Sequence, residues 1–170
     1  MRRICYQVAM SVDGYIAGPN GEFDWIVKDP EIDFAEIFKQ FDTLLIGRRT
    51  FETMVQHGNT TVPGMKSVVF SRTLRQSDYP DVTIVAEECD KAANALRAKR
   101  GKDIWLFGGG SLFRSLFQAG LVDTVEVGVS PVILGGGIPL LPSPATQAKL
   151  KLTGHKVYKT GIVSLQYAVK

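Results

Sequence analysis

The sequence has few of the residues that build metal, redox or disulfide sites. Its 170 residues include two cysteines and two histidines, and the spacing of Cys5 and Cys89 matches no metal-ligand or redox motif. We therefore predict no bound metal, and we expect both thiols to be reduced and packed as ordinary side chains in a cytoplasmic protein. His57 and His155 have no partner pattern, and we assign them no chemistry.

Long apolar runs and clusters of basic residues are also missing. No apolar stretch approaches the length that crosses a membrane. Arg2 and Arg3 precede an apolar run, but Gln7 and Asp13 interrupt it and no small-residue cleavage site follows, so the sequence predicts no signal peptide. The formal net charge is +3, yet the basic residues are spread along the chain. We therefore expect neither membrane nor nucleic acid as a partner, and small anions as the ligands of the basic residues.

Strand-like and helix-like segments alternate along most of the chain. The length and the 45% hydrophobic content fit one domain, residues 1–170, because no repeat, linker or low-complexity segment divides it. The predicted strands are 4–10, 43–46, 66–70, 82–85, 104–107, 124–133, 149–157 and 161–169, and the predicted helices are 31–41, 50–55, 89–99 and 111–118.

This alternation predicts an α/β fold with a mainly parallel sheet and helices on both of its faces. The four short apolar strands in the middle of the chain are expected to be buried on both faces. The last two strands differ from these buried strands. Residues 163–169 alternate between apolar and polar, and residues 156–161 supply a turn between the two strands. They predict an antiparallel hairpin.

Three glycines, Gly108 to Gly110, stand between an apolar strand and an amphipathic helix. Glycine lets an anion approach the backbone closely, and the helix supplies free N–H groups and the positive end of its dipole. A Rossmann dinucleotide motif would need a further glycine at Phe113 and would follow the first strand, so we do not expect a Rossmann fold. By itself the segment fits phosphate binding and a plain turn equally well.

Basic residues follow two other predicted strands. Arg48 and Arg49 come after the second strand, where Thr50 is expected to cap the next helix while the arginines face an anion. Ser71 and Arg72 come after the third strand, and they offer a hydroxyl and a guanidinium to a phosphate group. Because the carboxyl ends of parallel strands meet at one edge of a sheet, these segments and the glycines predict one anion site. A second glycine run, 135–137, lacks a following helix and predicts a turn or bulge beside that site.

Five short motifs, in their order along the chain, resemble those of the dihydrofolate reductase superfamily. The motifs are Ala9-Met-Ser-Val-Asp-Gly-Tyr-Ile-Ala17, Gly47-Arg-Arg-Thr50, Ser71-Arg72, Gly108-Gly-Gly110 and Pro131-Val-Ile-Leu-Gly-Gly-Gly137. The resemblance covers essentially the whole chain, and it is closer to the C-terminal reductase domain of the bacterial riboflavin-biosynthesis deaminase/reductase. It implies a three-layer fold with an eight-stranded, mostly parallel sheet, a C-terminal antiparallel hairpin and flanking helices.

The resemblance also implies NADPH as the hydride donor and a set of residues that bind it. Independently, cationic side chains favour NADPH over NADH, because a 2'-phosphate prefers cationic donors whereas a ribose hydroxyl prefers a carboxylate. The implied residues are Ala9 and Ile16 at the nicotinamide, Gly47, Arg48, Arg49 and Thr50 at the phosphates, Ser71 and Arg72 at the adenosine 2'-phosphate, and Gly109, Gly110, Ser111 and Leu112, together with Gly108, at the pyrophosphate.

A reductase also needs a substrate site and a source of protons. Hydride transfer to a C=N or C=O bond requires a proton at the neighbouring heteroatom, and a partly buried carboxylate can orient the ring and assist through water. The resemblance to dihydrofolate reductases makes Asp33 the candidate acid, and Trp25, Phe34 and Phe38 are the candidate aromatic contacts of the substrate. Alternatively, Asp33 or Glu31 only stabilises the start of a helix electrostatically. Asp13 is expected to be a turn residue.

One departure from the riboflavin branch concerns the substrate. Its reductases usually carry a glutamate where this chain has Gly108, and dihydrofolate reductases have glycine there. We expect an NADPH-dependent reductase of a pyrimidine, pterin or related nitrogen heterocycle, most similar to 5-amino-6-(5-phosphoribosylamino)uracil reductase. The alternatives are dihydrofolate reductase activity and a nucleotide-binding protein without catalysis. The alternating C-terminal strands would also allow a homodimer.

Overall fold

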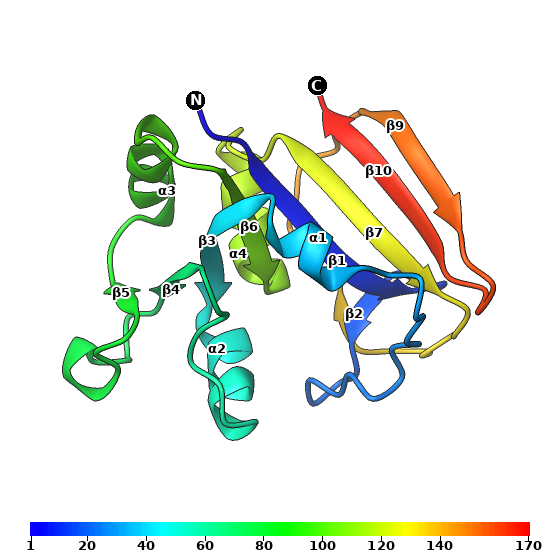
Figure 1. The fold of residues 1–170 in the computed structure, drawn as a ribbon, viewed down its shortest axis with the longest axis horizontal. Helices are drawn as coiled ribbons and strands as arrows, with labels where there is room; N and C mark the ends of the chain where they lie inside the picture. Colours follow the sequence, from blue (N-terminus) through cyan, green and yellow to red (C-terminus); the bar gives the residue numbers. More distant parts are fainter.

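The computed structural model describes residues 1–170, which form one eight-stranded sheet beside a small two-stranded one (Figure 1). In the large sheet the strand order is β5-β4-β3-β6-β1-β7-β10-β9. Neighbours from β5 to β7 are parallel, whereas β10 runs antiparallel to both β7 and β9. The mostly parallel sheet and the C-terminal hairpin are thus confirmed. The strands are β1 (Ile4–Ser11), β3 (Phe41–Gly47), β4 (Lys66–Phe70), β5 (Thr83–Val85), β6 (Asp103–Gly108), β7 (Thr124–Ser130), β9 (Leu150–Val157) and β10 (Val163–Val169).

Helices cover both faces of this sheet and make three layers. Figure 1 shows α1 in front of the sheet and α4 behind it. Ile37 of α1 and Phe51 of α2 pack into one hydrophobic cluster, whereas Ala93 of α3 and Leu116 of α4 pack into the other. The helices are α1 (Phe34–Phe38), α2 (Arg48–Gln56), α3 (Cys89–Ala98) and α4 (Gly110–Gln118), and a 3-10 turn spans Gln76–Asp78.

The central strands are apolar on both faces because each face packs under helices. Along β6, Ile104 and Leu106 enter the cluster under α3 and α4, while Trp105 between them enters the cluster under α1 and α2. This alternation is the two-residue period of a strand. The expectation of burial on both faces fails for β5, where Thr83 is exposed, because β5 is an edge strand.

Two of the predicted helices differ from the observed ones by two or more residues at one end at least, and the other two by a single residue. The helix predicted for 31–41 spans only Phe34–Phe38, because Phe41 is already buried in β3 beside Asp103. The helix predicted to start near Thr50 begins at Arg48, with Gly47 as its N-cap. The prediction that Thr50 caps this helix is therefore wrong. The extended backbone of Gly47 carries the chain from β3 straight into the helix and leaves Thr50 in the first turn.

Two strands too short to be predicted, β2 (Tyr15–Ala17) and β8 (Ile138–Pro139), form the small sheet. Their approach requires glycine, because a Cβ at Gly137 would lie 2.1 Å from the carbonyl oxygen of Ala17. Asp13 ties the same two segments together. Its carboxylate accepts hydrogen bonds from Ser11 Oγ at 2.7 Å and from the N–H groups of residues 134 and 135 at 3.0 and 2.7 Å. These bonds, the one from Ser11 first, lower the pKa of Asp13 to about 2.

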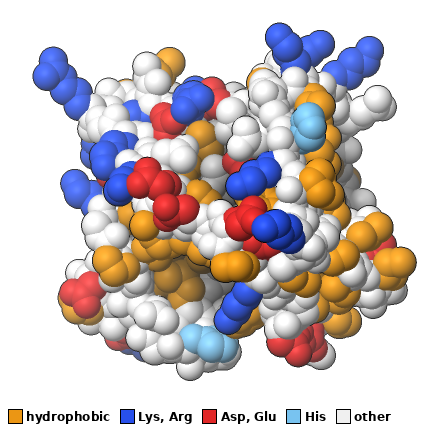
Figure 2. All heavy atoms as spheres, turned by 45° about the vertical axis from the view of Figure 1, so that its right-hand side comes forward, with side chains coloured by type: hydrophobic (Ala, Val, Ile, Leu, Met, Phe, Trp, Pro, Cys, Tyr) orange, Lys and Arg blue, Asp and Glu red, His pale blue; other side chains and the backbone are white.

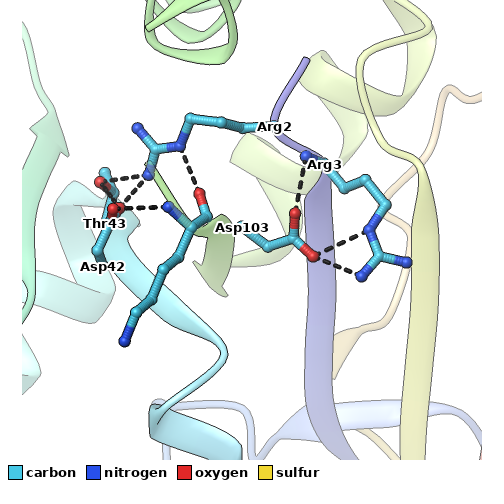
Figure 3. Close-up of polar contacts among 6 residues, drawn as sticks. Arg2, Arg3, Asp42, Thr43 and Asp103 are labelled. Carbon is cyan, nitrogen blue, oxygen red and sulfur yellow. Dashed lines mark hydrogen bonds and ion pairs between the residues drawn. The ribbon is translucent and has the colours of Figure 1, made fainter. Parts of the chain in front are cut away.

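Ion pairs join the amino ends of the strands (Figure 3). The Arg2 guanidinium reaches the carboxylate of Asp42 and donates to Thr43 Oγ1 at 2.8 Å. Arg3 Nε donates to Asp103 at 2.9 Å, and this bond and charge raise the pKa of Arg3. These contacts fasten the starts of β1, β3 and β6 to one another.

A third pair extends this arrangement to β7. Arg97 at the end of α3 lies 3.1 Å from Asp123, whose other oxygen accepts the N–H of Ile4 at 2.8 Å. At Asp42, burial raises the pKa, but the hydrogen bonds from Thr43 and from the backbone N–H of residue 102, with the charge of Arg2, lower it overall. The charged side chains at this end of the sheet thus satisfy one another.

The large sheet has two edge strands, β5 and β9. Strand β9 is almost entirely exposed. Leu152 and Val157 on this strand are 52% and 69% exposed. The sequence-based expectation of a homodimer through the C-terminal strands stays a prediction. None of the helices combines the length and the apolar character that a membrane span requires.

Candidate active site

A cavity of about 1300 Å³ lies at the carboxyl ends of the parallel strands. The turns after β3, β4 and β6 all contribute to it, so segments far apart in the sequence meet there, as the strand order requires. Except for Ala9, the cofactor residues implied by the resemblance all line this cavity, while their contacts with a ligand stay a prediction. They are Ile16, Gly47, Arg48, Arg49, Thr50, Ser71, Arg72, Gly108, Gly109, Gly110, Ser111 and Leu112.

Two helices begin at this cavity without a side-chain cap. Gly47 is the N-cap of α2 and Gly109 is the N-cap of α4, and neither has a side chain that can accept from the first-turn N–H groups. Such free N–H groups, at the positive ends of two helix dipoles, form a site for anions. A Cβ at Gly47 would lie 3.1 Å from the Gly109 nitrogen, so the absence of side chains also lets the two turns pack together.

Gly108 is the residue at which this chain departs from the riboflavin branch. Its φ of +152° is one that side chains rarely adopt, and a Cβ there would lie 3.3 Å from Thr50 Oγ1. The Gly108–Gly109 peptide bond is cis. Because backbone and space both disfavour a side chain, a glutamate would be strained at this position in this fold.

Both basic and acidic side chains line the cavity. Arg48 is paired with Glu52 on its own helix at 3.0 Å, whereas Arg49 and Arg72 have no ion-pair partner. Sequence reasoning missed three acidic residues at the end of β5 and the start of α3, although their position after a strand of the parallel sheet was available as a signal. These are Glu87, Glu88 and Asp90.

Ser71 is nearly buried and closes the turn after β4. Its Oγ accepts the N–H groups of Thr73 at 3.2 Å and Leu74 at 3.0 Å, and it forms a further hydrogen bond with Thr73 Oγ1 at 3.3 Å. Arg72 follows on the exposed side of the same turn. The structure therefore places a hydroxyl next to a guanidinium at the cavity, and their contact with a phosphate stays a prediction.

A second, smaller cavity of about 190 Å³ adjoins the first. Val8 and Ile26 line both cavities, so the two meet at these side chains. Most residues around the smaller cavity are hydrophobic, and they include Ala9, Phe34 and Trp105. Figure 2 shows a hollow in the molecular surface with hydrophobic side chains inside it and charged side chains around it.

The structure brings two of the predicted substrate residues together, since the ring centroids of Phe34 and Phe38 lie 6.2 Å apart, and places Trp25 elsewhere. Phe34 lines the smaller cavity, but Phe38 packs on Trp105 with 5.6 Å between ring centroids. Trp25 donates its indole N–H to the carbonyl of Glu22 at 2.9 Å and lines neither of the two cavities. Their roles in substrate binding stay predictions.

Asp33 is exposed and forms the N-cap of α1. Its carboxylate accepts the N–H of Glu36 at 3.1 Å, and the side chain lines neither cavity. This is the helix-terminal role that the sequence left as the alternative, so the catalytic role of Asp33 stays a prediction. Its neighbours Ile32 and Phe34 do line the smaller cavity.

A carboxylate that the sequence analysis missed does lie in the smaller cavity. Glu126 of β7 accepts hydrogen bonds from Gln7 Nε2 and Ser164 Oγ, both at 3.1 Å. Its signal was the alternation in 124–130, which sends the valines into the core and Glu126 to the other face.

Comparison with protein families identifies the chain. The model of the RibD C-terminal domain family matches residues 2–164. The chain belongs to this family. It is 34% identical to YyaP of Bacillus subtilis, in an alignment that covers 98% of this chain and 94% of YyaP.

Solved structures with this fold include two with lower identity. A pyrimidine reductase-like protein of Corynebacterium diphtheriae superposes with a TM-score of 0.76 at 17% identity, over 99% of this chain and 92% of that one. Dihydrofolate reductase of Enterococcus faecalis, solved with NADP(H), superposes with a TM-score of 0.72 at 20% identity, over 99% and 96% of the two chains. These likenesses confirm the predicted dihydrofolate-reductase-like fold.

Proposed function

We propose that this protein is an NADPH-dependent reductase of a planar nitrogen heterocycle. The observation that carries the proposal is the junction of two unlike cavities at Val8 and Ile26. The larger cavity has two uncapped helix N-termini and unpaired arginines, which suit a dinucleotide. The smaller one is mostly apolar and of a size that suits a ring. Their junction brings two ligands into contact, as hydride transfer requires.

The residues of the larger cavity fit NADPH. Free N–H groups at the starts of α2 and α4 suit the pyrophosphate, and Gly109, the N-cap of α4, lets an anion approach the backbone closely because it has no side chain. Arg49 and Arg72 would hold the 2'-phosphate, with Ser71 as a hydroxyl donor. When bound, the nicotinamide supplies hydride, and Ile16 and Ala9 on the sides of the two cavities would position it.

The residues of the smaller cavity would hold the second reactant. Phe34 and Ile37 of α1 and Trp105 of the sheet all line this cavity, and they would contact the ring. Asp33 is proposed to deliver a proton through water, which requires it to exchange its hydrogen bond with Glu36. The pyrimidine reductase-like and dihydrofolate reductase neighbours support a heterocyclic substrate of this kind.

Two substrates represent the two branches. The ribosylaminopyrimidine reduced by 5-amino-6-(5-phosphoribosylamino)uracil reductases is one candidate, in accordance with the family. Dihydrofolate is the second, and the φ of +152° at Gly108 favours it, since this is the residue that dihydrofolate reductases share.

A titration of the purified protein with NADPH and with NADH tests the proposal. We expect micromolar binding of NADPH and roughly hundredfold weaker binding of NADH, because two charge-assisted bonds to the 2'-phosphate are lost. Each candidate substrate is then added, and oxidation of the cofactor is followed at its nicotinamide absorbance band. Binding without oxidation would favour a nucleotide-binding protein without catalysis, and no binding of either nucleotide would overturn the cofactor assignment.

A further inference from the structure

Strand β7 places a carboxylate against open space in the smaller cavity. Val125 and Val127 are buried in the cluster under α4, whereas Glu126 and Gly128 alternate onto the opposite face and line the cavity. A Cβ at Gly128 would meet no atom within 4 Å. A ligand can therefore lie over Gly128 and reach the carboxylate beside it.

The hydrogen-bonding capacity of Glu126 is half used. Its Oε2 accepts from Gln7 and its Oε1 accepts from Ser164, each at 3.1 Å. A carboxylate has about four acceptor positions, so about one remains on each oxygen. No lysine, arginine or histidine forms an ion pair with Glu126. A carboxylate in mostly apolar surroundings is stabilised by further donors, which a ligand in this cavity can supply.

The chemistry of these two free positions points to one kind of ring edge. One acceptor position on each oxygen is complementary to two adjacent N–H groups in a plane. A pyrimidine or pterin ring with a 2-amino and a 4-oxo group offers such an edge, formed by the ring N–H and the amine. A 2,4-dioxo ring has a carbonyl on each side of that N–H. One of these carbonyls would face a carboxylate oxygen, and two facing acceptors leave both unpaired.

We propose that Glu126 selects heterocycles with a 2-amino-4-oxo pyrimidine edge over the corresponding 2,4-dioxo rings. The inference rests on the proposed function for the place of the substrate. It narrows the substrate class to aminopyrimidinones and pterins. Glu126 contacts the ring, whereas Gln7 and Ser164 are positioning residues that hold the carboxylate toward the open side.

Pterin and lumazine are a matched pair of probes, because these two bicyclic rings differ only in an amino or an oxo group at position 2. Binding of each to the purified, nucleotide-free protein is followed by the fluorescence of the ring, at a pH where both rings are neutral. We expect pterin to bind at least about tenfold more tightly than lumazine. In Glu126→Gln this ratio should fall to about threefold or less, because an amide offers one acceptor and one donor.

Two further variants keep the test decisive. Glu36→Gln removes an exposed carboxylate that is paired with Lys39 outside both cavities, and the ratio should persist. Gly128→Leu leaves Glu126 and its partners in place but fills the adjacent space, so pterin binding should be lost while NADPH binding persists. This variant provides the answer if Glu126→Gln does not fold.

The outcomes separate this inference from the proposed function. A wild-type ratio near one, an unchanged ratio in Glu126→Gln, or undiminished pterin binding in Gly128→Leu would each overturn the role of Glu126. NADPH binding is measured on the same preparations. If the protein prefers pterin through Glu126 but binds no NADPH, the proposed reductase is refuted and the ring selectivity stands. If it binds NADPH but does not prefer pterin, the ring selectivity is refuted and the proposed reductase stands.

Discussion

The two ends of the sheet use the same kinds of charged residue in opposite ways. At the amino ends, Arg2, Arg3 and Arg97 each pair with an aspartate from another segment. At the carboxyl ends, Arg49 and Arg72 have no ion-pair partner, and two helices begin at glycines that cannot cap them. Charges satisfied within the chain contribute to stability. Those left unsatisfied are available for binding a ligand, and a functional site that keeps such groups is less stable than it could be.

The largest expected effect is on NADPH affinity, and it comes from removing the two unpaired arginines. Arg49→Ala combined with Arg72→Ala should weaken NADPH binding about hundredfold, because two charge-assisted bonds to the extra phosphate are lost, and should leave NADH binding nearly unchanged. Isothermal titration with both nucleotides measures this. Arg75→Ala, which removes an exposed arginine outside both cavities, is the control. Equal weakening of both nucleotides would contradict the assignment.

The complementary change breaks an ion pair at the amino ends of the strands, and it should affect stability rather than binding. Arg2→Met should lower the free energy of unfolding by about 2 kcal/mol, because the carboxylate of Asp42 loses its cation while part of it stays shielded from water. This figure is below the full cost of breaking a buried pair because the Asp42 side chain is 34% exposed. Urea denaturation measures the loss, and NADPH affinity should not change. If Arg2→Met loses NADPH affinity but not stability, the amino end of the sheet serves binding, and the contrast between the two ends is wrong.

Asp13 tests whether a paired carboxylate at the carboxyl end also contributes to stability. Its pKa is lowered from 3.8 to about 2 by hydrogen bonds, the one from Ser11 first. The folded state therefore binds this proton less readily than the unfolded state. The stabilisation is present above about pH 4 and is lost as the pH falls toward about 2.

In Asp13→Asn, the melting temperature should be lower than in the wild type near neutral pH, and the difference should shrink between about pH 4 and about pH 2. Thermal melts followed by circular dichroism across this range measure it. Asp81→Asn, which removes an exposed carboxylate without a hydrogen-bond partner, is the control. A constant difference down to the lowest pH would show that the hydrogen bonds of Asp13 do not depend on its charge.

The smallest expected effect is a change in NADPH affinity on removal of an acidic side chain that lines the larger cavity. Glu87→Gln should raise NADPH affinity about twofold to threefold, because a carboxylate that repels the phosphates through water is removed. The gain should be smaller for NADH, which lacks the 2'-phosphate. Glu31→Gln removes a carboxylate paired with Lys159 outside this cavity and should change neither affinity. Unchanged NADPH binding in Glu87→Gln would place Glu87 too far from the phosphates to matter.

The sequence was informative wherever a pattern extended over several residues. The apolar strands and the C-terminal hairpin follow from two-residue periodicity, and the meeting of the basic and glycine segments at one cavity follows from their places at the ends of parallel strands. The helix predicted for 31–41 was too long, because the burial of Phe41 in β3 overrides local helix propensity. The strands β2 and β8 could not be predicted, since two or three residues carry no period.

The site residues divide in the same way. Residues whose backbone position alone brings them to the cavity, such as Gly47 and Gly109, were predictable from their places at strand ends. Residues whose role depends on side-chain direction were not. Asp33 was chosen by resemblance and lies outside both cavities, whereas the alternation of β7 pointed to Glu126 and was not used.

The shared boundary of the two cavities would set the separation between the two proposed reactants. Val8 and Ile26 line both cavities, so in the proposed reductase the bulk of these side chains would determine how closely the ring and the cofactor approach. Hydride transfer depends steeply on that distance, while the affinity for either ligand depends on groups elsewhere. A larger side chain at Val8 would therefore keep the two ligands bound but too far apart to react. Such a variant would allow the complex to be observed before hydride transfer.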